Sequence, residues 1–127
     1  MWGVSFANAK LGVAGGDKNL LRTPDGGKTW ISLTTSPLVH VEAVRFTSAS
    51  HVVGVGFNLP AMANPGPAAM TSDDAGLTWT LHPVPFDKGG QIQDLACNDA
   101  TCVAVGTGGG GAAGLVLCCA RLALAAC

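Results

Sequence analysis

The chain has 127 residues, of which 12% are charged and 48% are hydrophobic, and its formal net charge is −1 at pH 7. This length predicts one domain that buries about two thirds of its unfolded surface. With only seven Lys and Arg residues there is no basic footprint for nucleic acid or an anionic membrane, and the apolar content excludes a disordered tail. The most apolar stretch, Ala112 to Cys127, has 16 residues including Arg121, against the ~18 that a membrane span requires. We therefore expect no nucleic-acid partner and no membrane span.

Glycine is enriched: it makes up 18 of the 127 residues, about twice the usual ~7%. Val, Thr and Trp occur in short runs, which together with the glycines predicts β-structure rich in turns. The N-terminus has neither a basic region nor a continuous apolar segment, so the sequence predicts no targeting signal in this chain.

An internal repeat organises the sequence. Residues 4–16 align without gaps with residues 44–56, and a third copy at 94–106 follows after a further 50 residues. Each copy has a short apolar strand, a polar turn and a second apolar strand that ends in glycine. This pattern predicts a β-hairpin in every copy.

A second shared segment follows each of the first two hairpins. Residues 22–30 match residues 71–79, and the tryptophans that end these segments, Trp30 and Trp79, are 49 rather than 40 residues apart. The nine extra residues fall within 57–69, where three prolines argue against a central strand. This segment is predicted to be an inserted loop.

The repeat predicts four short strands in each complete copy. They are expected near 3–6, 11–15, 19–22 and 29–33, near 41–46, 51–56, 68–71 and 78–82, and in the third copy near 91–95, 101–106 and 114–117. Four strands in a period of 40–50 residues are typical of β-propeller blades. We therefore expect an all-β fold of four-stranded antiparallel propeller blades, an incomplete propeller in one partial domain.

The expected blade boundaries leave an atypical apolar tail. Blade one is predicted at 1–38, blade two at 39–86 and a partial blade three at 87–117, which leaves 118–127 outside the repeat. Two interpretations stay open for this tail. It is either a short C-terminal helix over 122–126, whose Leu and Ala residues favour helix, or a truncated or frame-shifted gene end.

Two turns share the pattern Ser/Thr-x-Asp-x-Gly-x-Thr-Trp. Its residues are Thr23, Asp25, Gly27, Thr29 and Trp30 in the first copy, and Ser72, Asp74, Gly76, Thr78 and Trp79 in the second. In such a turn the Asp accepts backbone N–H bonds, the Gly supplies a left-handed backbone, and the Trp buries a large aromatic face. These roles are structural rather than catalytic. The pattern resembles the Asp-box, or bacterial neuraminidase repeat, of sialidases and other β-propellers, where the turn joins the outer two strands of a blade, away from the usual ligand site.

The chain combines the first hairpin motif, residues 4–16, with the segment Leu-Leu-Arg-Thr-Pro-Asp-Gly-Gly-Lys-Thr-Trp at 20–30. This combination is most similar to the photosystem II assembly and stability factor propellers. The resemblance covers roughly residues 3–117. It implies a non-enzymatic, seven-bladed propeller that binds protein partners, of which this chain holds about two and a half blades.

Two other functional sites can be excluded from the residues. Residues 26–29, Gly-Gly-Lys-Thr, match the end of the phosphate-binding motif Gly-x4-Gly-Lys-Thr. The first glycine of that motif is replaced by Arg22, and a predicted strand follows where the motif requires a helix. A resemblance to sialidases would imply a tyrosine–glutamate nucleophile pair, an aspartate acid/base and three arginines that bind the substrate carboxylate. This chain has no tyrosine, a single glutamate, Glu42, and an arginine beside the first Asp motif. It is therefore not a complete sialidase.

No metal or cofactor site is predicted. His40, His51 and His82 are too far apart in sequence for a metal-ligand pattern, and the run Gly108 to Gly111 is interpreted as a hairpin loop rather than a phosphate cradle. Cys118, Cys119 and Cys127 fit no zinc spacing.

Cys97 and Cys102 flank the turn of the third hairpin, where they form either a disulfide or two free buried thiols. A bond there would resemble the Cys-x4-Cys hairpins of some secreted Asp-box propellers. The pair is more typical of an oxidising compartment, which points to an extracytoplasmic space or a plastid lumen, while the localisation itself stays open.

The resulting hypothesis is a binding scaffold rather than an enzyme, with a protein partner. The predicted contact surface is the inserted loop, because long loops on rigid blades carry function; its residues include Asn58, Pro60, Met62, Asn64 and Pro67. The alternatives are a fragment of a sialidase-type glycoside hydrolase, or a carbohydrate-binding propeller with Trp2, Phe57 or Phe86 stacking on a glycan. Unpaired blade edges predict self-association of the isolated chain.

Overall fold

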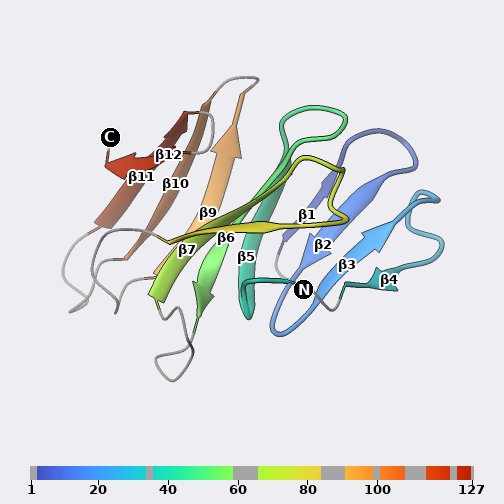
Figure 1. The fold of residues 1–127 in the computed structure, drawn as a ribbon, viewed down its shortest axis with the longest axis horizontal. Coiled ribbons are helices and arrows are strands. Elements are labelled where there is room, and N and C mark those ends of the chain that lie inside the picture. Colours follow the sequence, from blue (N-terminus) through green and yellow to red (C-terminus); the bar gives the residue numbers. More distant parts are fainter. Residues whose placement is uncertain are drawn as a thin grey trace.

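The structure is a computed structural model that describes residues 3–33, 36–58, 66–83, 91–98, 101–107, 114–120 and 123–126. Twelve strands in these residues form three four-stranded antiparallel sheets. The sheets lie side by side in chain order (Figure 1), and we call them blades one, two and three. The described segments contain no helix of the length and apolarity needed to cross a membrane.

Each blade is a meander in which strands adjacent in sequence pair with one another. Blade one contains β1 (Gly3–Phe6), β2 (Gly12–Gly15), β3 (Leu20–Thr23) and β4 (Ile31–Ser32). Blade two contains β5 (His40–Phe46), β6 (Val52–Asn58), β7 (Gly66–Ser72) and β8 (Thr80–Pro83). Blade three contains β9 (Gln91–Cys97), β10 (Thr101–Thr107), β11 (Gly114–Ala120) and β12 (Ala123–Ala126). The expected all-β fold of four-stranded antiparallel sheets is confirmed.

The apolar tail forms part of blade three. β11 continues to Ala120, and β12 pairs with it antiparallel in a register that sets Leu117 opposite Ala126. The predicted helix over 122–126 is therefore wrong, since 123–126 is a strand. A helix of so few residues is marginal by itself, whereas β12 gains hydrogen bonds from the neighbouring edge of β11.

The inserted loop is shorter than predicted, because β6 and β7 extend into it. Asn58 pairs with Gly66 and Phe57 with Pro67, which narrows the connection to residues 59–65. Pro67 is tolerated in β7 because the pairing of this strand with β8 begins at the next residue, Ala68.

The third hairpin has a shorter turn than the second. Val44 pairs with Gly54 in blade two, whereas in blade three Leu95 pairs with Ala104, the residue 50 positions after Gly54. Leu95 therefore takes the place of Val44, so the offset of 50 between the second and third copies holds along β10 but is 51 along β9. The turn between Cys97 and Cys102 is one residue shorter than that between Phe46 and Val52, and both blades have a bulge at the same place, opposite Val55 and Gly56 and opposite Val105 and Gly106.

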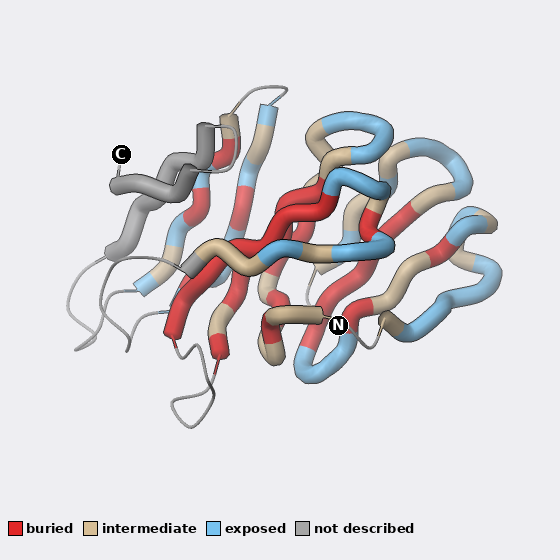
Figure 2. Tube along the Cα trace, viewed as in Figure 1, coloured by how far each residue is buried: buried red, intermediate tan, exposed pale blue. Residues whose placement is uncertain are grey.

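The core lies between the blades (Figure 2). One cluster fills the boundary between blades one and two; it comprises Val13, Leu20, Leu38, Val41, Val44, Ala68 and Met70. A second cluster fills the boundary between blades two and three; it comprises Ala43, Val53, Val55, Ala69, Ile92, Leu95, Cys102 and Ala104. Blade two is covered on both faces, so β7 is buried along its whole length and its sequence shows no alternation of apolar and polar residues.

Candidate interaction site

Side-chain hydrogen bonds organise the turn between β3 and β4. Asp25 Oδ1 accepts a bond from the Thr29 backbone N–H at 2.9 Å, and Asp25 Oδ2 accepts one from the Thr29 hydroxyl at 2.5 Å. The Thr23 hydroxyl donates to Asp25 Oδ1 at 2.9 Å and accepts from the Gly27 N–H at 2.8 Å. Gly26 and Gly27 have φ angles of 76° and 90°, which favour glycine at these positions. The turn is thus held together within seven residues, 23–29.

The turn between β7 and β8 repeats this geometry with serine in place of threonine. The Ser72 hydroxyl donates to Asp74 Oδ1 at 2.7 Å and accepts from the Gly76 N–H at 2.9 Å. Asp74 accepts from the Thr78 N–H at 2.8 Å and from the Thr78 hydroxyl at 2.5 Å. Below, the segments 23–30 and 72–79 are called the Asp turns.

The Asp-turn carboxylates are held in their ionised form. Hydrogen bonds from the hydroxyl and backbone N–H of Thr78, and from the Ser72 hydroxyl, lower the pKa of Asp74 from 3.8 to about 2. Bonds from the Thr29 hydroxyl and N–H likewise lower the pKa of Asp25. A general acid must carry a proton near the working pH. Neither group does so at neutral pH, and both have a structural role instead.

The tryptophans of the two Asp turns differ in their surroundings. Trp79 is partly buried against the cluster between blades one and two, and its Nε1–H donates to the Gly76 carbonyl at 3.0 Å. Trp30 meets Phe6 edge to face, with ring centroids 6.3 Å apart, and it is solvent-exposed.

The Asp turns lie at the same end of the blades as the first hairpin turns. The Gly26 N–H donates to the Lys10 carbonyl at 2.7 Å, and the Ala75 N–H donates to the Ser50 carbonyl at 2.8 Å. β6 ends at Asn58 and β7 begins at Gly66 at the opposite end of blade two. The candidate interaction site is this opposite end of blades one and two.

Three segments far apart in sequence meet there. Asn58 Oδ1 accepts from the Val39 N–H at 2.9 Å, and Asn58 Nδ2 donates to the Pro37 carbonyl at 3.2 Å. The Lys18 N–H donates to the Val39 carbonyl at 2.7 Å, which joins the β2–β3 turn to the same segment. The Asn58 residue is only 5% exposed. It is an anchor for the segment between the blades rather than a contact residue.

A stacked pair lies beside this anchor. The rings of His40 and Phe57 are 4.4 Å apart and nearly parallel, at 14°. His40 Nδ1 is 3.1 Å from Asp17 Oδ1, in the turn between β2 and β3. The ring of Phe57 is thus covered by His40 on one face, which disfavours Phe57 as a platform for a glycan.

The structure places the predicted loop residues in different settings. Asn58 and Pro67 belong to paired, buried strands, so their assignment to an exposed loop is corrected. Pro60, Met62 and Asn64 lie outside the described residues, as do Trp2 and Phe86. The sequence does not predict this anchoring role of Asn58; its one signal there is an amide at the end of the apolar run of β6.

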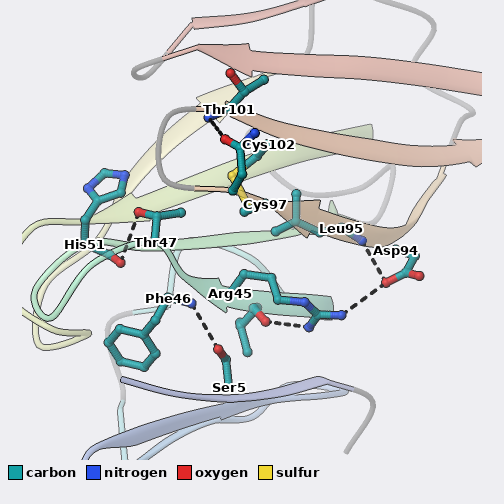
Figure 3. The surroundings of a disulfide bond; sticks show 12 residues. Ser5, Arg45, Phe46, Thr47, His51, Asp94, Leu95, Cys97, Thr101 and Cys102 are labelled. Carbon is teal, nitrogen blue, oxygen red and sulfur yellow. Dashed lines mark hydrogen bonds and ion pairs between the residues drawn. A yellow bond between two sulfur atoms is a disulfide. The ribbon is translucent and has the colours of Figure 1, made fainter. Parts of the chain in front are cut away.

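Cys97 and Cys102 are joined by a disulfide and pair directly across β9 and β10, with Cα atoms 4.0 Å apart (Figure 3). The same figure shows Arg45 Nη2 reaching Asp94 Oδ1 at 3.6 Å between blades two and three. The Arg45 side chain is partly exposed and that of Asp94 largely exposed, so this ion pair contributes little stability.

The histidines are separated in space. His51 Nδ1 lies 2.6 Å from Asp73 Oδ1, and His82 Nε2 lies 2.7 Å from the Thr71 hydroxyl. His40 contacts Asp17 at the opposite end. Within the part of the chain that the structure describes, no three His, Cys, Asp or Glu side chains are grouped as metal ligands.

No family model and no curated protein matches the chain. Several chains of solved structures do match, and one of them is YCF48 bound to a D1 peptide. The TM-score is 0.61 and the sequence identity 22%, and the match covers 91% of this chain and 39% of that chain. This chain thus spans well under half the length of YCF48. YCF48 is a β-propeller, and the likeness shows that the three sheets of this chain are consecutive blades of a β-propeller fold.

Proposed function

We propose that the chain is a non-enzymatic, protein-binding part of a β-propeller that resembles the photosystem II assembly and stability factors, and that its partner is an extended peptide segment. The observation that carries the proposal is that the connection 59–65 begins and ends on two strands that pair with each other, β6 and β7. The β6–β7 ladder runs up to the pair Asn58–Gly66, and Asn58 also holds the segment that joins blade one to blade two.

A connection that begins and ends on paired strands is well suited to binding, because its ends are already ordered. The two ends of the connection are held next to each other by paired strands, so binding does not have to order them. Loops positioned by a rigid scaffold are where binding residues concentrate. The loop sequence supplies a flexible apolar side chain, Met62, and the polar amide of Asn64, both suited to a peptide with apolar and backbone groups.

Two further observations support a peptide partner and a non-catalytic role. The matched propeller YCF48 is bound to a D1 peptide, which suggests the same class of partner here. The carboxylates of Asp25 and Asp74 are engaged within their own turns, so neither is available as a proton donor.

Fluorescence polarisation tests the proposal, with labelled overlapping peptides of the D1 protein titrated against the chain. We expect saturable binding of one peptide, weakened at least tenfold by the triple substitution Pro60→Ser, Met62→Ser and Asn64→Ser. The matched control is Lys10→Ser, an exposed position at the Asp-turn end, which should bind as the wild type does. Circular dichroism verifies that both variants fold.

Two outcomes would contradict the proposal. One is equal loss of affinity in the loop variant and the control variant. The other is saturable binding of a sialoside or another glycan with no peptide bound, which would favour the carbohydrate-binding alternative.

A further inference from the structure

Three cysteines lie in one row across blade three. Cys97 on β9 pairs directly with Cys102 on β10, and Cys102 pairs directly with Cys119 on β11. These three strands are neighbours in the sheet (Figure 1). Directly opposite positions of an antiparallel sheet share one face, and Cys102 belongs to the cluster between blades two and three. The three residues, which we call the cysteine row, therefore occupy positions on the face that packs against blade two.

The register of the cysteine row suits a disulfide at either end. Directly opposite Cα atoms of an antiparallel pair are about 4.5–5.5 Å apart, and disulfides join residues whose Cα atoms are roughly 4.4–6.8 Å apart. The disulfide Cys97–Cys102 uses one of the two pairs. The pair Cys102–Cys119 offers a second position for the same bond, and Cys102 is common to both.

The preceding cysteine, Cys118, occupies a different register position. It pairs with Val103 rather than with a cysteine. Successive positions of a strand belong to opposite faces of the sheet, so the position of Cys118 is on the face away from the cysteine row. Of these two adjacent cysteines, Cys119 is the one that stands opposite the disulfide.

The burial of the disulfide decides which thiolate can reach it. Cys102 is only 3% exposed, and Cys97 is partly buried against the same cluster. Thiol–disulfide exchange requires access to the sulfur that is attacked. A thiol in solution is shielded from the sulfur of Cys102, whereas Cys119 occupies the neighbouring register position on the next strand. The attacking group for Cys102 is therefore available within the sheet itself.

We propose that the cysteine row is a thiol–disulfide exchange site, in which the disulfide passes between Cys97–Cys102 and Cys102–Cys119. The thiol of Cys119 first releases its proton to solvent, and the thiolate then attacks Sγ of Cys102. A bond forms between these two sulfurs, the Cys97–Cys102 bond breaks, and its electron pair leaves on Cys97 Sγ, which takes up a proton. One disulfide replaces another, so the step consumes no oxidant and no reductant. Because Cys102 lies between the other two in the row, the attacking and leaving positions are on opposite sides of it.

The hairpin of β9 and β10 can keep its shape during the exchange. The Asn98 N–H donates to the Thr101 carbonyl at 2.9 Å, and the Thr101 N–H donates to Asn98 Oδ1 at 2.8 Å. The turn is thus closed by hydrogen bonds as well as by the disulfide.

The exchange changes which strands are covalently joined. In one state the disulfide links β9 to β10, and in the other it links β10 to β11. β9 supplies Ile92 and Leu95 to the cluster that docks blade three on blade two. Passage of the disulfide to Cys119 therefore removes the covalent support of this docking strand, and it leaves Cys97 as a partly buried free thiol at the boundary.

Differential alkylation of the full chain tests the exchange, in a Cys127→Ser background because Cys127 lies outside the described residues. The oxidised chain is incubated without reductant at about pH 8.5, the ordinary pKa of a thiol. Free thiols are blocked with N-ethylmaleimide, the remaining cysteines are reduced and labelled with iodoacetamide, and fragment masses assign each label to a residue. We expect two populations, one with Cys119 blocked and one with Cys97 blocked, in a ratio that does not depend on protein concentration. Cys119→Ser should lower the blocking of Cys97 at least tenfold, whereas the matched control Cys118→Ser should leave it unchanged.

A second variant traps the alternative disulfide and does not depend on the folding of Cys119→Ser. In Cys97→Ser, glutathione disulfide should oxidise Cys102 and Cys119 to a disulfide and be reduced to two glutathione thiols. Circular dichroism verifies that each variant folds. Two free thiols at Cys102 and Cys119 in this variant, or a bond from Cys102 to Cys118, would overturn the proposal. Blocking of Cys97 that is absent from the parent chain, or that Cys119→Ser does not lower, would overturn it as well.

Discussion

Arg22 donates its Nε–H to the carbonyl oxygen of Ala75 across the boundary between blades one and two, over 2.9 Å. Ala75 lies in the second Asp turn with φ at 59°, and Arg22 directly precedes the first Asp turn. The side chain of one repeat is thus bonded to the turn of the next. The Asp turn therefore does more than connect two strands: it also offers a backbone acceptor to the neighbouring blade.

Replacing Arg22 by Ala should destabilise the boundary between the first two blades. A hydrogen bond with a charged donor contributes about 1.5–3 kcal/mol, and we expect the free energy of unfolding to fall by about 1.5 kcal/mol because Arg22 is only partly buried. Urea unfolding followed by tryptophan fluorescence measures the change. Lys10→Ala removes an exposed charge of the same sign and should be neutral; an equal effect of the two variants would contradict the role of the Arg22–Ala75 bond.

Acid should weaken the chain through Asp74. The pKa of Asp74 in the folded chain is about 2, below its ordinary value of 3.8, so ionised Asp74 stabilises the folded state fully above pH ~4. That contribution is lost as the pH falls from there through about 2. We expect Asp74→Asn to lower the urea midpoint at neutral pH and to flatten its decline over this acid range. Glu42→Gln, which removes a carboxylate outside the Asp turns, should leave the slope unchanged.

A methyl group at Gly56 should be poorly tolerated. A Cβ there would lie 1.8 Å from the carbonyl oxygen of His40, and one at Gly106 would lie 1.9 Å from that of Gln91. Backbone atoms cannot move aside as a flexible side chain can, so we expect Gly56→Ala to cost about 3 kcal/mol. Thermal unfolding measures the loss. Ser50→Ala, in an exposed turn of the same blade, serves as the control; comparable melting temperatures for both variants would contradict this expectation.

Removing the disulfide should have a moderate effect. Cys97 and Cys102 enclose a short loop, with a sequence separation of 5, for which loop-closure entropy gives roughly 2 kcal/mol. We expect the double variant Cys97→Ala and Cys102→Ala to lose this amount of unfolding free energy, as judged by urea midpoints. Reductant should shift the midpoint of the wild type towards that of the double variant and leave the double variant unchanged. A shift of the same size in both would assign the effect to the other cysteines.

Local chemistry explains what the sequence could predict. The Asp turn at 23–30 is closed by bonds between residues at most four positions apart, so its pattern can be read from a short segment. The hairpins carry their own turns, and their apolar strands predict β-structure directly. The sequence leaves the Cys97–Cys102 pairing open, because a spacing cannot distinguish a disulfide from two free thiols.

Features that depend on contacts between residues distant in the sequence cannot be predicted from a short segment. β12 forms because β11 offers it a free edge, although its Ala and Leu residues favour helix when considered alone. The shift of Leu95 into the place of Val44 follows from a turn that is one residue shorter in blade three, which only the pairing of β9 with β10 reveals. The anchor role of Asn58 depends on carbonyl and N–H groups about 20 residues earlier in the chain.

The pairing of Asn58 with Gly66 also has an evolutionary and practical consequence. Because the β6–β7 ladder is complete up to this pair, the segment between the two residues can be lengthened, shortened or replaced while the strands keep their register. The longer second repeat is an example of such an insertion. This junction is therefore a natural place for grafting recognition segments, where one propeller framework could acquire new specificities by exchanging a single connection.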